Sequence, residues 1–192
     1  MVTIGVLDLQ GGVREHIKLL NQIPNVTSQQ VKKKEHFNNL DGLILPGGES
    51  TTISKLINIF NLKDNIITLA QSGIPIWGTC AGMILLAKKI VGSKINSLNL
   101  MDITVKRNAY GNQLASFKTK EIIPAISQQK LPLVFIRAPY IVNKNKKVKT
   151  LLELEGKIVA AEQNNILATA FHPELTRDLN VHKYFVNKVK SN

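Results

Sequence analysis

The feature that most constrains the fold of this chain is a repeated succession of an apolar run, a glycine-rich break and a helical pattern through its first half. Val2 to Leu9 is predicted to form a buried strand that turns at Gly11-Gly12 into an amphipathic helix. Gly42 to Leu45, followed by Pro46-Gly47-Gly48, and Ile74 to Trp77 are two further buried strands. This alternation of strands and helices is typical of an α/β fold with a parallel sheet.

The second half of the sequence has a different pattern, because short apolar segments follow one another with little helical periodicity between them. Such segments predict antiparallel strands added to a parallel core. Before them, Ser50 or Thr51 is expected to cap a helix, and Ala81 to Lys89 to form an apolar helix. An amphipathic helix, Asp178 to Lys190, closes the chain. The predicted strands are Leu98 to Arg107, Gln113 to Lys118, Leu133 to Ile136, Thr150 to Leu154, Lys157 to Gln163 and Ile166 to Phe171.

Composition and local patterns restrict the compartment and the number of domains that we expect for this protein. No 18-residue apolar run is present, and the first residues lack the basic leader and cleavage site of a signal peptide. The single cysteine, Cys80, cannot form an internal disulfide, which agrees with a reducing compartment. No repeat or linker divides the sequence. We therefore expect a cytoplasmic protein of one domain, residues 1–192, with a flavodoxin-like three-layer α/β fold whose central sheet is mixed and mainly parallel, with added antiparallel strands.

The charge of the chain is strongly basic, with 25 Lys and Arg against 13 Asp and Glu and a net charge of +12. Such a balance raises the possibility of a nucleic-acid partner. The lysines cluster in short stretches, Lys32 to Lys34 and Lys144 to Lys149, without interleaved aromatic residues, zinc-finger spacing or a helix-turn-helix. The pattern favours a solvated surface, with no nucleic-acid or membrane partner.

The strongest local motif is Gly78-Thr79-Cys80-Ala81-Gly82, between a predicted strand and a predicted helix. A sharp strand-to-helix turn needs small residues beside the residue at its tip, because bulky neighbours would collide with the sheet. A cysteine there points beyond the strand end, the helix N-terminus favours its thiolate, and the Ala81 amide is free to stabilise an oxyanion. The alternative is an inert buried cysteine, which is common for this residue. The motif favours a nucleophile at Cys80.

A second motif, Phe171-His172-Pro173-Glu174, follows the last predicted strand. Pro173 keeps the chain extended, so the side chains of His172 and Glu174 emerge on the same side. Glu174 can then orient one imidazole nitrogen while the other faces a nucleophile, as a cysteine nucleophile requires. An isolated histidine is more often a satisfied core or surface residue, and that interpretation is preferred for His16, His36 and His182.

A third motif, Leu45 to Thr51, is again a strand end that leads into a helix. Its glycines let backbone amides approach a ligand, and Glu49 offers a charge for an ammonium group. The lysine and spacing of a Walker phosphate loop are absent, and a glycine turn without function is the simpler alternative. One cysteine and scattered histidines form no cluster with metal-site spacing, so no metal is expected.

In this order, the three motifs resemble the class I glutamine amidotransferases. More narrowly, the sequence is similar to the family of glutaminase subunits of two-component pyridoxal 5′-phosphate synthases. The narrower resemblance covers the chain from near its start to the final helix. It rests on Gly5-Val6-Leu7 with Leu9-Gln10-Gly11, Arg14-Glu15-His16, Leu45 to Thr51, Gly78 to Leu86, Arg107-Asn108-Ala109-Tyr110-Gly111, Phe135-Ile136-Arg137-Ala138-Pro139 and Phe171 to Thr176.

The resemblance implies hydrolysis of L-glutamine to glutamate and ammonia through a γ-glutamyl thioester, without a cofactor. The ammonia would be delivered to a separate barrel-shaped synthase subunit that builds the vitamin B6 cofactor. Cys80 is implied to be the nucleophile, with His172 and Glu174 completing the triad. The glutamine-binding positions of the family fall on Gly47, Gly48, Glu49, Arg107, Ile136 and Arg137, and the oxyanion would meet the backbone amides of Ala81 and Gly48.

The sequence departs from that family's pattern at Asp8, Asn112, Ala115 and Lys118. These departures bear on the contact surface with the partner, and Asp8 also on the neighbouring loop 9–11. Two alternatives stay open: the glutaminase subunit of another amidotransferase, such as imidazole glycerol phosphate synthase, and a non-enzymatic nucleic-acid-binding module suggested only by the charge. The segments 107–111 and 135–139 favour the glutaminase subunit of a pyridoxal 5′-phosphate synthase over the first alternative.

Overall fold

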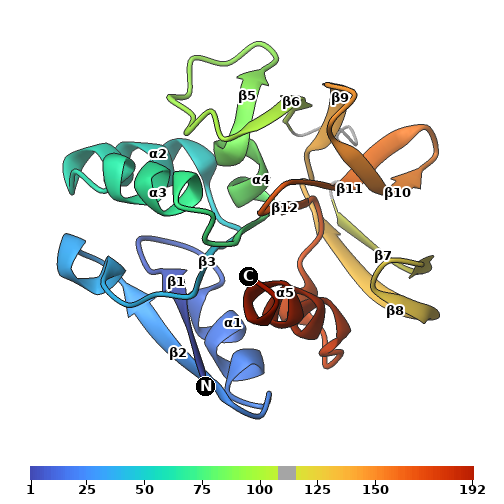
Figure 1. Cartoon of the computed structure of the whole chain (residues 1–192). Coiled ribbons are helices and arrows are strands. Elements are labelled where there is room, and N and C mark those ends of the chain that lie inside the picture. Colours follow the sequence, from blue (N-terminus) through green and yellow to red (C-terminus); the bar gives the residue numbers. More distant parts are fainter. Residues whose placement is uncertain (108–115) are drawn as a thin grey trace.

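The computed structural model describes residues 1–107 and 116–192. Its larger sheet has the order β2-β1-β3-β4-β12-β11-β9-β6-β5, with β10 paired to β11, and β7 and β8 form a separate two-stranded sheet (Figure 1). The strands are β1 (Val2–Leu7), β2 (Val26–Val31), β3 (Gly42–Leu45), β4 (Ile76–Thr79), β5 (Ala87–Ile90), β6 (Met101–Lys106), β7 (Ser116–Ile123), β8 (Ser127–Ile136), β9 (Tyr140–Lys144), β10 (Lys149–Leu154), β11 (Lys157–Gln163) and β12 (Ile166–Thr169). The helices are α1 (Val13–Leu20), α2 (Ser50–Ile59), α3 (Lys63–Gln71), α4 (Ala81–Leu86) and α5 (Asn180–Lys190), with 3₁₀ turns η1 (Lys34–Phe37) and η2 (Pro173–Leu175).

One part of the larger sheet is parallel, as the sequence predicts. β1 pairs with β2 and β3, β3 with β4, and β4 with β12, each in parallel. Every residue of β3, β4 and β12 is buried, because helices cover both faces of these strands. Since the strands run the same way, the loops that follow them meet at one edge of the sheet. These loops carry Gly11, Gly47, Cys80 and His172.

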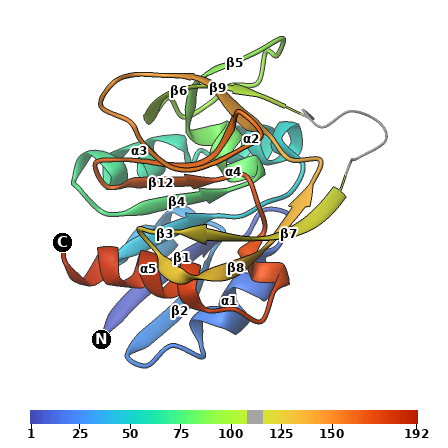
Figure 2. The ribbon, with the colours of Figure 1, turned by 90° about the vertical axis from the view of Figure 1, so that its right-hand side faces the viewer.

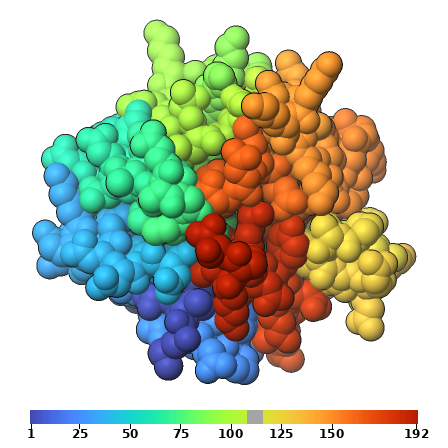
Figure 3. Space-filling view, in the orientation of Figure 1, coloured from blue at the N-terminus to red at the C-terminus, as the bar shows by residue number. Residues whose placement is uncertain are grey.

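Helices cover the two faces of this parallel part. In Figure 1, α2, α3 and α4 lie on one side of the strands β1, β3, β4 and β12, and α1 and α5 lie on the other. Figure 2 shows α1 and α5 together beneath the same strands. In Figure 3, α5 lies in the middle of one face, between the blue N-terminal segments and the yellow hairpin of β7 and β8. The expected three-layer α/β fold with a mixed sheet is confirmed.

The rest of the larger sheet is mostly antiparallel. β11 pairs with β12, β10 and β9, and β9 with β6, all antiparallel, while β5 returns parallel to β6 at the far edge. β7 and β8 were expected among these strands but form a hairpin of their own, tied to the His172 segment by a bond from the His172 amide to the carbonyl of Val134 at 2.7 Å. No helix of residues 1–107 or 116–192 is long and apolar enough to cross a membrane.

Several predicted boundaries are wrong. The predicted helix from Ala81 to Lys89 ends at Leu86, because the backbone becomes extended at Ala87 and β5 pairs with β6. β4 extends up to the nucleophile turn, covering 76–79 instead of 74–77, since its pairing with β12 continues to Thr79. The strands β2, β5 and β9 were not predicted. The strand ends predicted at Leu9, Arg107 and Phe171 lie beyond the observed ends of β1, β6 and β12.

Candidate active site

Cys80 sits at a strained turn between β4 and α4. Its backbone has φ 46° and ψ −99°, a conformation that L-residues rarely adopt. A Cβ added to Gly82 would strike the carbonyl oxygen of Leu45, and one added to Gly78 would lie 2.5 Å from the Gly82 backbone. The turn therefore accepts only small residues on both sides of the cysteine, as the motif predicts. The Cys80 side chain is nearly buried, with Sγ 3.8 Å from the carbonyl oxygen of Ile136.

His172 and Glu174 form a buried pair next to this turn. His172 Nδ1 lies 2.7 Å from Glu174 Oε1, and the Glu174 side chain is only 1% exposed. Pro173 begins the short turn η2, so the two side chains meet across a tight bend and not along the extended chain that we expected. The predicted pairing of His172 with Glu174 is confirmed, but its cause is the tight turn at Pro173 and not an extended chain.

The environment of His172 favours its charged form. Burial is the largest single influence and lowers its pKa, but hydrogen bonds to Cys80 and Glu174 and the negative charge of Glu174 outweigh burial and raise the pKa to about 10. The influence of Cys80 on the pKa of His172 and their shared cavity indicate that the two side chains lie close together, as proton transfer requires. The arrangement can hold a thiolate beside an imidazolium.

The glycine loop after β3 lies against both of these side chains. A Cβ on Gly47 would overlap the His172 ring and come within 3.3 Å of the Cys80 Cβ, so glycine is required there. The Gly47 carbonyl accepts a hydrogen bond from the Gly12 amide at 3.1 Å, and the Gln10 side chain accepts one from the Glu49 amide at 2.7 Å. The loop after β1 thus holds the loop after β3 in place.

Glu49 caps α2, which corrects the expectation that Ser50 or Thr51 does so. Its carboxylate accepts hydrogen bonds from the amides of Thr51 at 3.0 Å and Thr52 at 2.6 Å. Burial acts to raise the pKa of Glu49, but the hydrogen bonds from Thr52 and Thr51 lower it to about 2. Glu49 therefore presents a fixed negative charge at the site.

Three residues from the antiparallel part approach from the opposite side. Arg107, after β6, places Nη2 3.6 Å from Glu49 Oε1 and Nη1 3.5 Å from Ser93 Oγ. Ile136 ends β8 and is 39% exposed. Arg137 follows with a positive φ of 45°, a second strained backbone at the site. Within the described residues Arg137 has no ion pair, which leaves its guanidinium available to a ligand.

A cavity of about 370 Å³ joins most of these residues. Its volume falls in the range of small-molecule sites. It holds the predicted nucleophile, base and recognition residues together, with Gly47 behind Cys80, Ala81 beside it and Glu174 behind His172. The lining residues are Gly48, Glu49, Ser50, Cys80, Ile84, Arg107, Ile136, Arg137 and His172.

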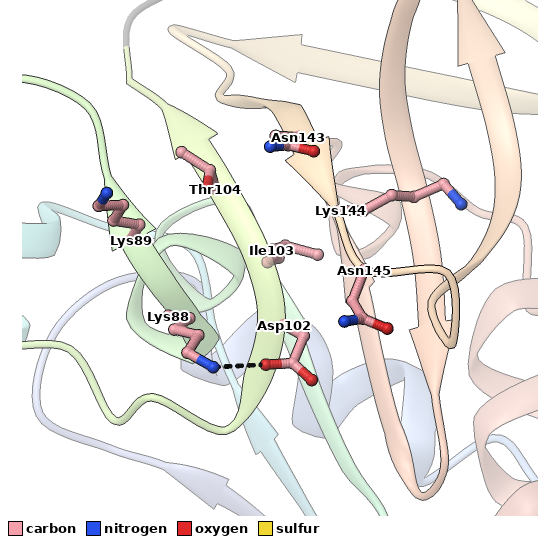
Figure 4. A pocket seen from close by; sticks show the side chains of 8 residues that line it. All are labelled: Lys88, Lys89, Asp102, Ile103, Thr104, Asn143, Lys144 and Asn145. Carbon is pink, nitrogen blue, oxygen red and sulfur yellow. Dashed lines mark hydrogen bonds and ion pairs between the residues drawn. The ribbon is translucent and has the colours of Figure 1, made fainter.

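A larger hollow of about 490 Å³ lies elsewhere, at the edge formed by β5, β6 and β9 (Figure 4). Lys88 Nζ is 3.0 Å from Asp102 Oδ1 there, and the Lys144 amine donates to the carbonyl of Val148 at 2.8 Å. In Figure 4 the Lys144 amine points away from the Lys88–Asp102 pair. Among the described residues the hollow is lined by no cysteine or histidine, and the pKa of its Asp102 is lowered by hydrogen bonds to Lys88 and Gln163, as in a surface ion pair, so size alone does not mark the chemical site.

Two histidines that were interpreted from the sequence as satisfied core or surface residues lie directly behind the pair. His16 Nε2 is 3.5 Å from Glu174 Oε2, and His16 Nδ1 is 2.9 Å from His182 Nε2. Both histidines are fully buried. The signal in the sequence is that each stands on the apolar face of an amphipathic helix, His16 between Val13 and Leu20 and His182 beside Phe185. His36 instead accepts a bond from the Lys32 amide at 3.3 Å, away from the site.

The departures from the family pattern fall outside the cavity or outside the described residues. Asp8 Oδ2 pairs with Lys32 Nζ at 3.0 Å. Lys118 is exposed on β7. Asn112 and Ala115 lie in the segment 108–115, outside the described residues. Across 1–107 and 116–192, no three His, Cys, Asp or Glu residues are grouped so as to hold a metal ion.

Sequence comparison connects this geometry with known proteins. Residues 6–191 match the model of the SNO glutamine amidotransferase family. The chain is 58% identical over 183 residues to "Pyridoxal 5′-phosphate synthase subunit PdxT" of Thermoanaerobacter sp. (strain X514), covering 95% of this chain and 97% of that protein. It is 50% identical over 192 residues to the protein of the same name from Clostridium botulinum (strain Loch Maree / Type A3), covering the whole of both.

Solved structures agree. A crystal structure described as a glutamine amidotransferase is 39% identical, with a TM-score of 0.91 over 97% of this chain and 98% of that one. The structure of PurLQS from Thermotoga maritima matches with a TM-score of 0.67, over 97% of this chain and 98% of that one, at 15% identity. The second likeness concerns the fold alone.

Proposed function

Since the chain belongs to the SNO glutamine amidotransferase family, we propose that it hydrolyses L-glutamine to L-glutamate and ammonia and supplies the ammonia to the synthase subunit of a pyridoxal 5′-phosphate synthase. The observation that carries the proposal is the strained turn at Cys80, which shares one cavity with His172, whose Nδ1 is held 2.7 Å from Glu174. The proposed glutaminase domain comprises residues 1–192.

In the first half of the reaction, the Cys80 thiolate attacks the side-chain carboxamide carbon of glutamine. The resulting oxyanion is proposed to meet the backbone amides of Ala81 and Gly48. The Ala81 amide supports this role, because it belongs to the first turn of α4, where amides have no partner within the helix. The imidazolium of His172 then protonates the departing nitrogen, the carbon–nitrogen bond breaks, and a γ-glutamyl thioester and ammonia result.

In the second half, water attacks the thioester carbon while neutral His172 takes the proton of that water. The carbon–sulfur bond breaks, glutamate leaves, and Cys80 returns as the thiolate beside the imidazolium. Glu174 holds the ring in orientation and stabilises its positive charge in both halves. Every step uses groups of the protein, so the proposed chemistry needs no metal or cofactor.

Glutamine is a zwitterion, and the cavity offers partners of both signs. We assign the α-ammonium group to Glu49, whose carboxylate stays ionised, and the α-carboxylate to Arg107 and Arg137. Gly47, Gly48 and Ile136 would shape the space for the carbon chain. The 3.6 Å contact between Arg107 and Glu49 keeps both charges within the cavity.

The proposed partner is a barrel-shaped synthase subunit in a hetero-oligomeric complex. Relatives at 50–58% identity over at least 95% of this chain are named as subunits of pyridoxal 5′-phosphate synthase, which supports this acceptor over that of imidazole glycerol phosphate synthase. The net charge of +12 would speed association with an acidic partner surface, an effect that salt weakens. The free cysteine supports a cytoplasmic location.

The test is glutamate release by the purified chain, alone and titrated with the synthase subunit of a pyridoxal 5′-phosphate synthase. The synthase subunit of imidazole glycerol phosphate synthase serves as the matched control. We expect glutamate release to rise and saturate with the first partner and to be unaffected by the second. If only the imidazole glycerol phosphate synthase subunit stimulated release, that enzyme would be the acceptor of the ammonia. If no glutamate were released with either subunit, the glutaminase proposal would be wrong.

A further inference from the structure

A buried pair of histidines lies directly behind the proposed triad. His16 belongs to α1 and His182 to α5, which are far apart in sequence but lie side by side in Figures 1 and 2. The catalytic steps above use neither residue. Burying two imidazoles costs free energy unless their nitrogens are paired, so their placement needs an explanation.

The contacts of this pair lead from the core to the triad carboxylate. His182 Nε2 lies 2.9 Å from His16 Nδ1, and His16 Nε2 lies 3.5 Å from Glu174 Oε2 and 3.4 Å from Thr79 Oγ1. Trp77 is edge-on to both rings, with centroids 5.5 Å from His16 and 5.0 Å from His182. Trp77 thus packs against both rings, and Glu174 lies near the Nε2 atom of His16.

Both imidazoles are neutral. Burial lowers the pKa of His16 well below its ordinary value, and the nearby His182 and His172 lower it further. Burial alone lowers the pKa of His182 to about 3. Each neutral ring therefore carries one proton, and a single proton must lie between the two nitrogens that are 2.9 Å apart.

Only one of the two possible proton placements suits Glu174. If His16 held its proton on Nδ1, its Nε2 lone pair would face the carboxylate, and His182 would bury an unpaired N–H. If His182 donates from Nε2 instead, His16 carries its proton on Nε2 and directs it toward Glu174 Oε2 and Thr79 Oγ1. The unpaired atom is then the acceptor His182 Nδ1, which has no partner within the described residues and costs less than an unpaired donor.

The same arrangement accounts for the second oxygen of Glu174. Oε1 is taken by His172, and Oε2 is buried without a hydrogen-bond partner among the described residues, with His16 Nε2 3.5 Å away. A carboxylate held at one oxygen can rotate, which would move the imidazole that it orients. An N–H dipole aimed at Oε2 opposes this rotation, and because His16 is neutral it does not compete with His172 for the negative charge.

We propose that His16, kept as its Nε2–H tautomer by His182, is a positioning residue that fixes the Glu174 carboxylate and thereby His172. The proposal rests on the proposed function for its turnover measurements, but not for the geometry. It assigns the α1–α5 contact a role in rate and not in glutamine binding, because neither histidine lines the cavity.

The first experiment compares His16→Leu with His16→Gln in the full chain, assayed with the synthase subunit. Leucine fills the space without a donor, whereas the glutamine amide can place an N–H near the Nε2 position. Losing a donor that points toward a charged group gives an expected fall in kcat of roughly tenfold to a hundredfold for His16→Leu, with KM within about twofold. His16→Gln should recover most of kcat, since it restores the donor.

Phe185→Leu is the matched control, because Phe185 is buried on α5 against Trp77 but lacks a polar contact. It should lower stability while kcat per folded molecule stays unchanged. If His16→Leu does not fold, His182→Leu against His182→Gln repeats the comparison one step further back. The proposal would be overturned if, in the pair of variants that folds, the leucine and glutamine variants had the same kcat. It would also be overturned if the leucine variant kept the kcat of the wild type.

A second readout separates this proposal from the glutaminase assignment. The rate of Cys80 alkylation by iodoacetamide reports how well His172 supports the thiolate, and it needs neither glutamine nor a partner. His16→Leu should slow alkylation about as much as it lowers kcat, and His16→Gln should restore it. If the wild-type chain hydrolysed no glutamine but showed this alkylation pattern, the proposed function would fall and the role of His16 would stand. Equal alkylation rates in wild type and His16→Leu would contradict that role.

Discussion

The parallel and antiparallel parts of this molecule contribute different things to one cavity. The parallel strands β3, β4 and β12 are wholly buried and end in the turns that hold Cys80 and His172. β6 and the second half of β8 alternate buried residues with more exposed ones, and Arg107, Ile136 and Arg137 lie at the ends of these strands or just after them. In the proposed mechanism, the parallel part supplies the reacting groups and Glu49, and the antiparallel part supplies the two arginines for the α-carboxylate of the substrate.

The difference in burial suits the two tasks. A nucleophile and its base need fixed geometry and little water, which a strained turn inside a buried sheet provides. A charged ligand needs groups that it can reach from solvent, and Ile136 and Arg137 are both exposed. Variants of Cys80, His172 and Glu174 should therefore change kcat, whereas variants of Arg107 and Arg137 should change KM.

Cys80→Ser is expected to have the largest effect. A serine hydroxyl is a far weaker nucleophile in a site built for a thiolate, so kcat should fall by at least roughly a thousandfold. The substitution is nearly isosteric, so circular dichroism and the thermal midpoint should match those of the wild type. Turnover close to that of the wild type in the folded variant would break the assignment of chemistry to the parallel part.

Glu174→Gln should have the second-largest effect on kcat. The amide keeps the shape of Glu174 but loses the charge that stabilises the His172 imidazolium, so kcat should fall by roughly a hundredfold or more while KM changes little. Steady-state kinetics of glutamate release at saturating synthase subunit measures both constants. An unchanged kcat would remove Glu174 from the triad.

Arg137→Ala tests the antiparallel part. Losing a charge-assisted contact with the α-carboxylate should raise KM for glutamine by roughly tenfold to a hundredfold, with a much smaller change in kcat. Lys130→Ala, on the same strand β8 and exposed, is the control for loss of a positive charge. If both variants behave like the wild type, Arg137 does not contact substrate.

The smallest predicted effect is on the pH dependence of the unfolding free energy. A histidine whose pKa is lower in the folded state than its unfolded value near 6.5 stabilises the fold above 6.5, and that stability is lost as pH falls. His182 should cost about 1.4 kcal/mol of unfolding free energy between pH 7.5 and 5.5. The raised pKa of His172 acts in the opposite sense, because its contribution is full below 6.5 and is lost as pH rises toward 10.

Urea unfolding at the two pH values isolates the contribution of His182. The pH dependence of His182→Leu should differ from that of the wild type by about 1.4 kcal/mol, while Phe185→Leu should be less stable at both pH values by the same amount. Identical pH dependence in wild type and His182→Leu would mean that His182 is not held neutral in the fold.

The parallel part, and the meeting of Cys80 and His172 at one edge of it, could be predicted from the sequence. Cys80 and His172 follow short apolar runs, and parallel strands bring the ends of such runs to one edge whatever the details of the loops. That rule needs no knowledge of tertiary contacts. For the same reason the mixed α/β fold could be predicted before the strand order was known.

The failures have a common cause in tertiary contacts. β5 carries Lys88 and Lys89 and follows an apolar helix without a breaker, so only its pairing with β6 reveals a strand. The caps of α2 were assigned to Ser50 or Thr51 because hydroxyl residues usually take that role, but Glu49 reaches both amides. The interpretation of His16 as a satisfied core or surface residue agrees with its burial, but its contact with His182 could not be predicted, because packing and not local pattern brings α1 and α5 together.

The most direct test of the account is to look for the thioester. Wild-type chain in complex with the synthase subunit, mixed with labelled glutamine and quenched in acid during turnover, should carry one γ-glutamyl group on Cys80. At saturating glutamine, Arg137→Ala should carry it too, because its defect lies in binding, whereas Cys80→Ser should carry none. Glutamate release without label on Cys80, or label on the Cys80→Ser chain, would contradict the account.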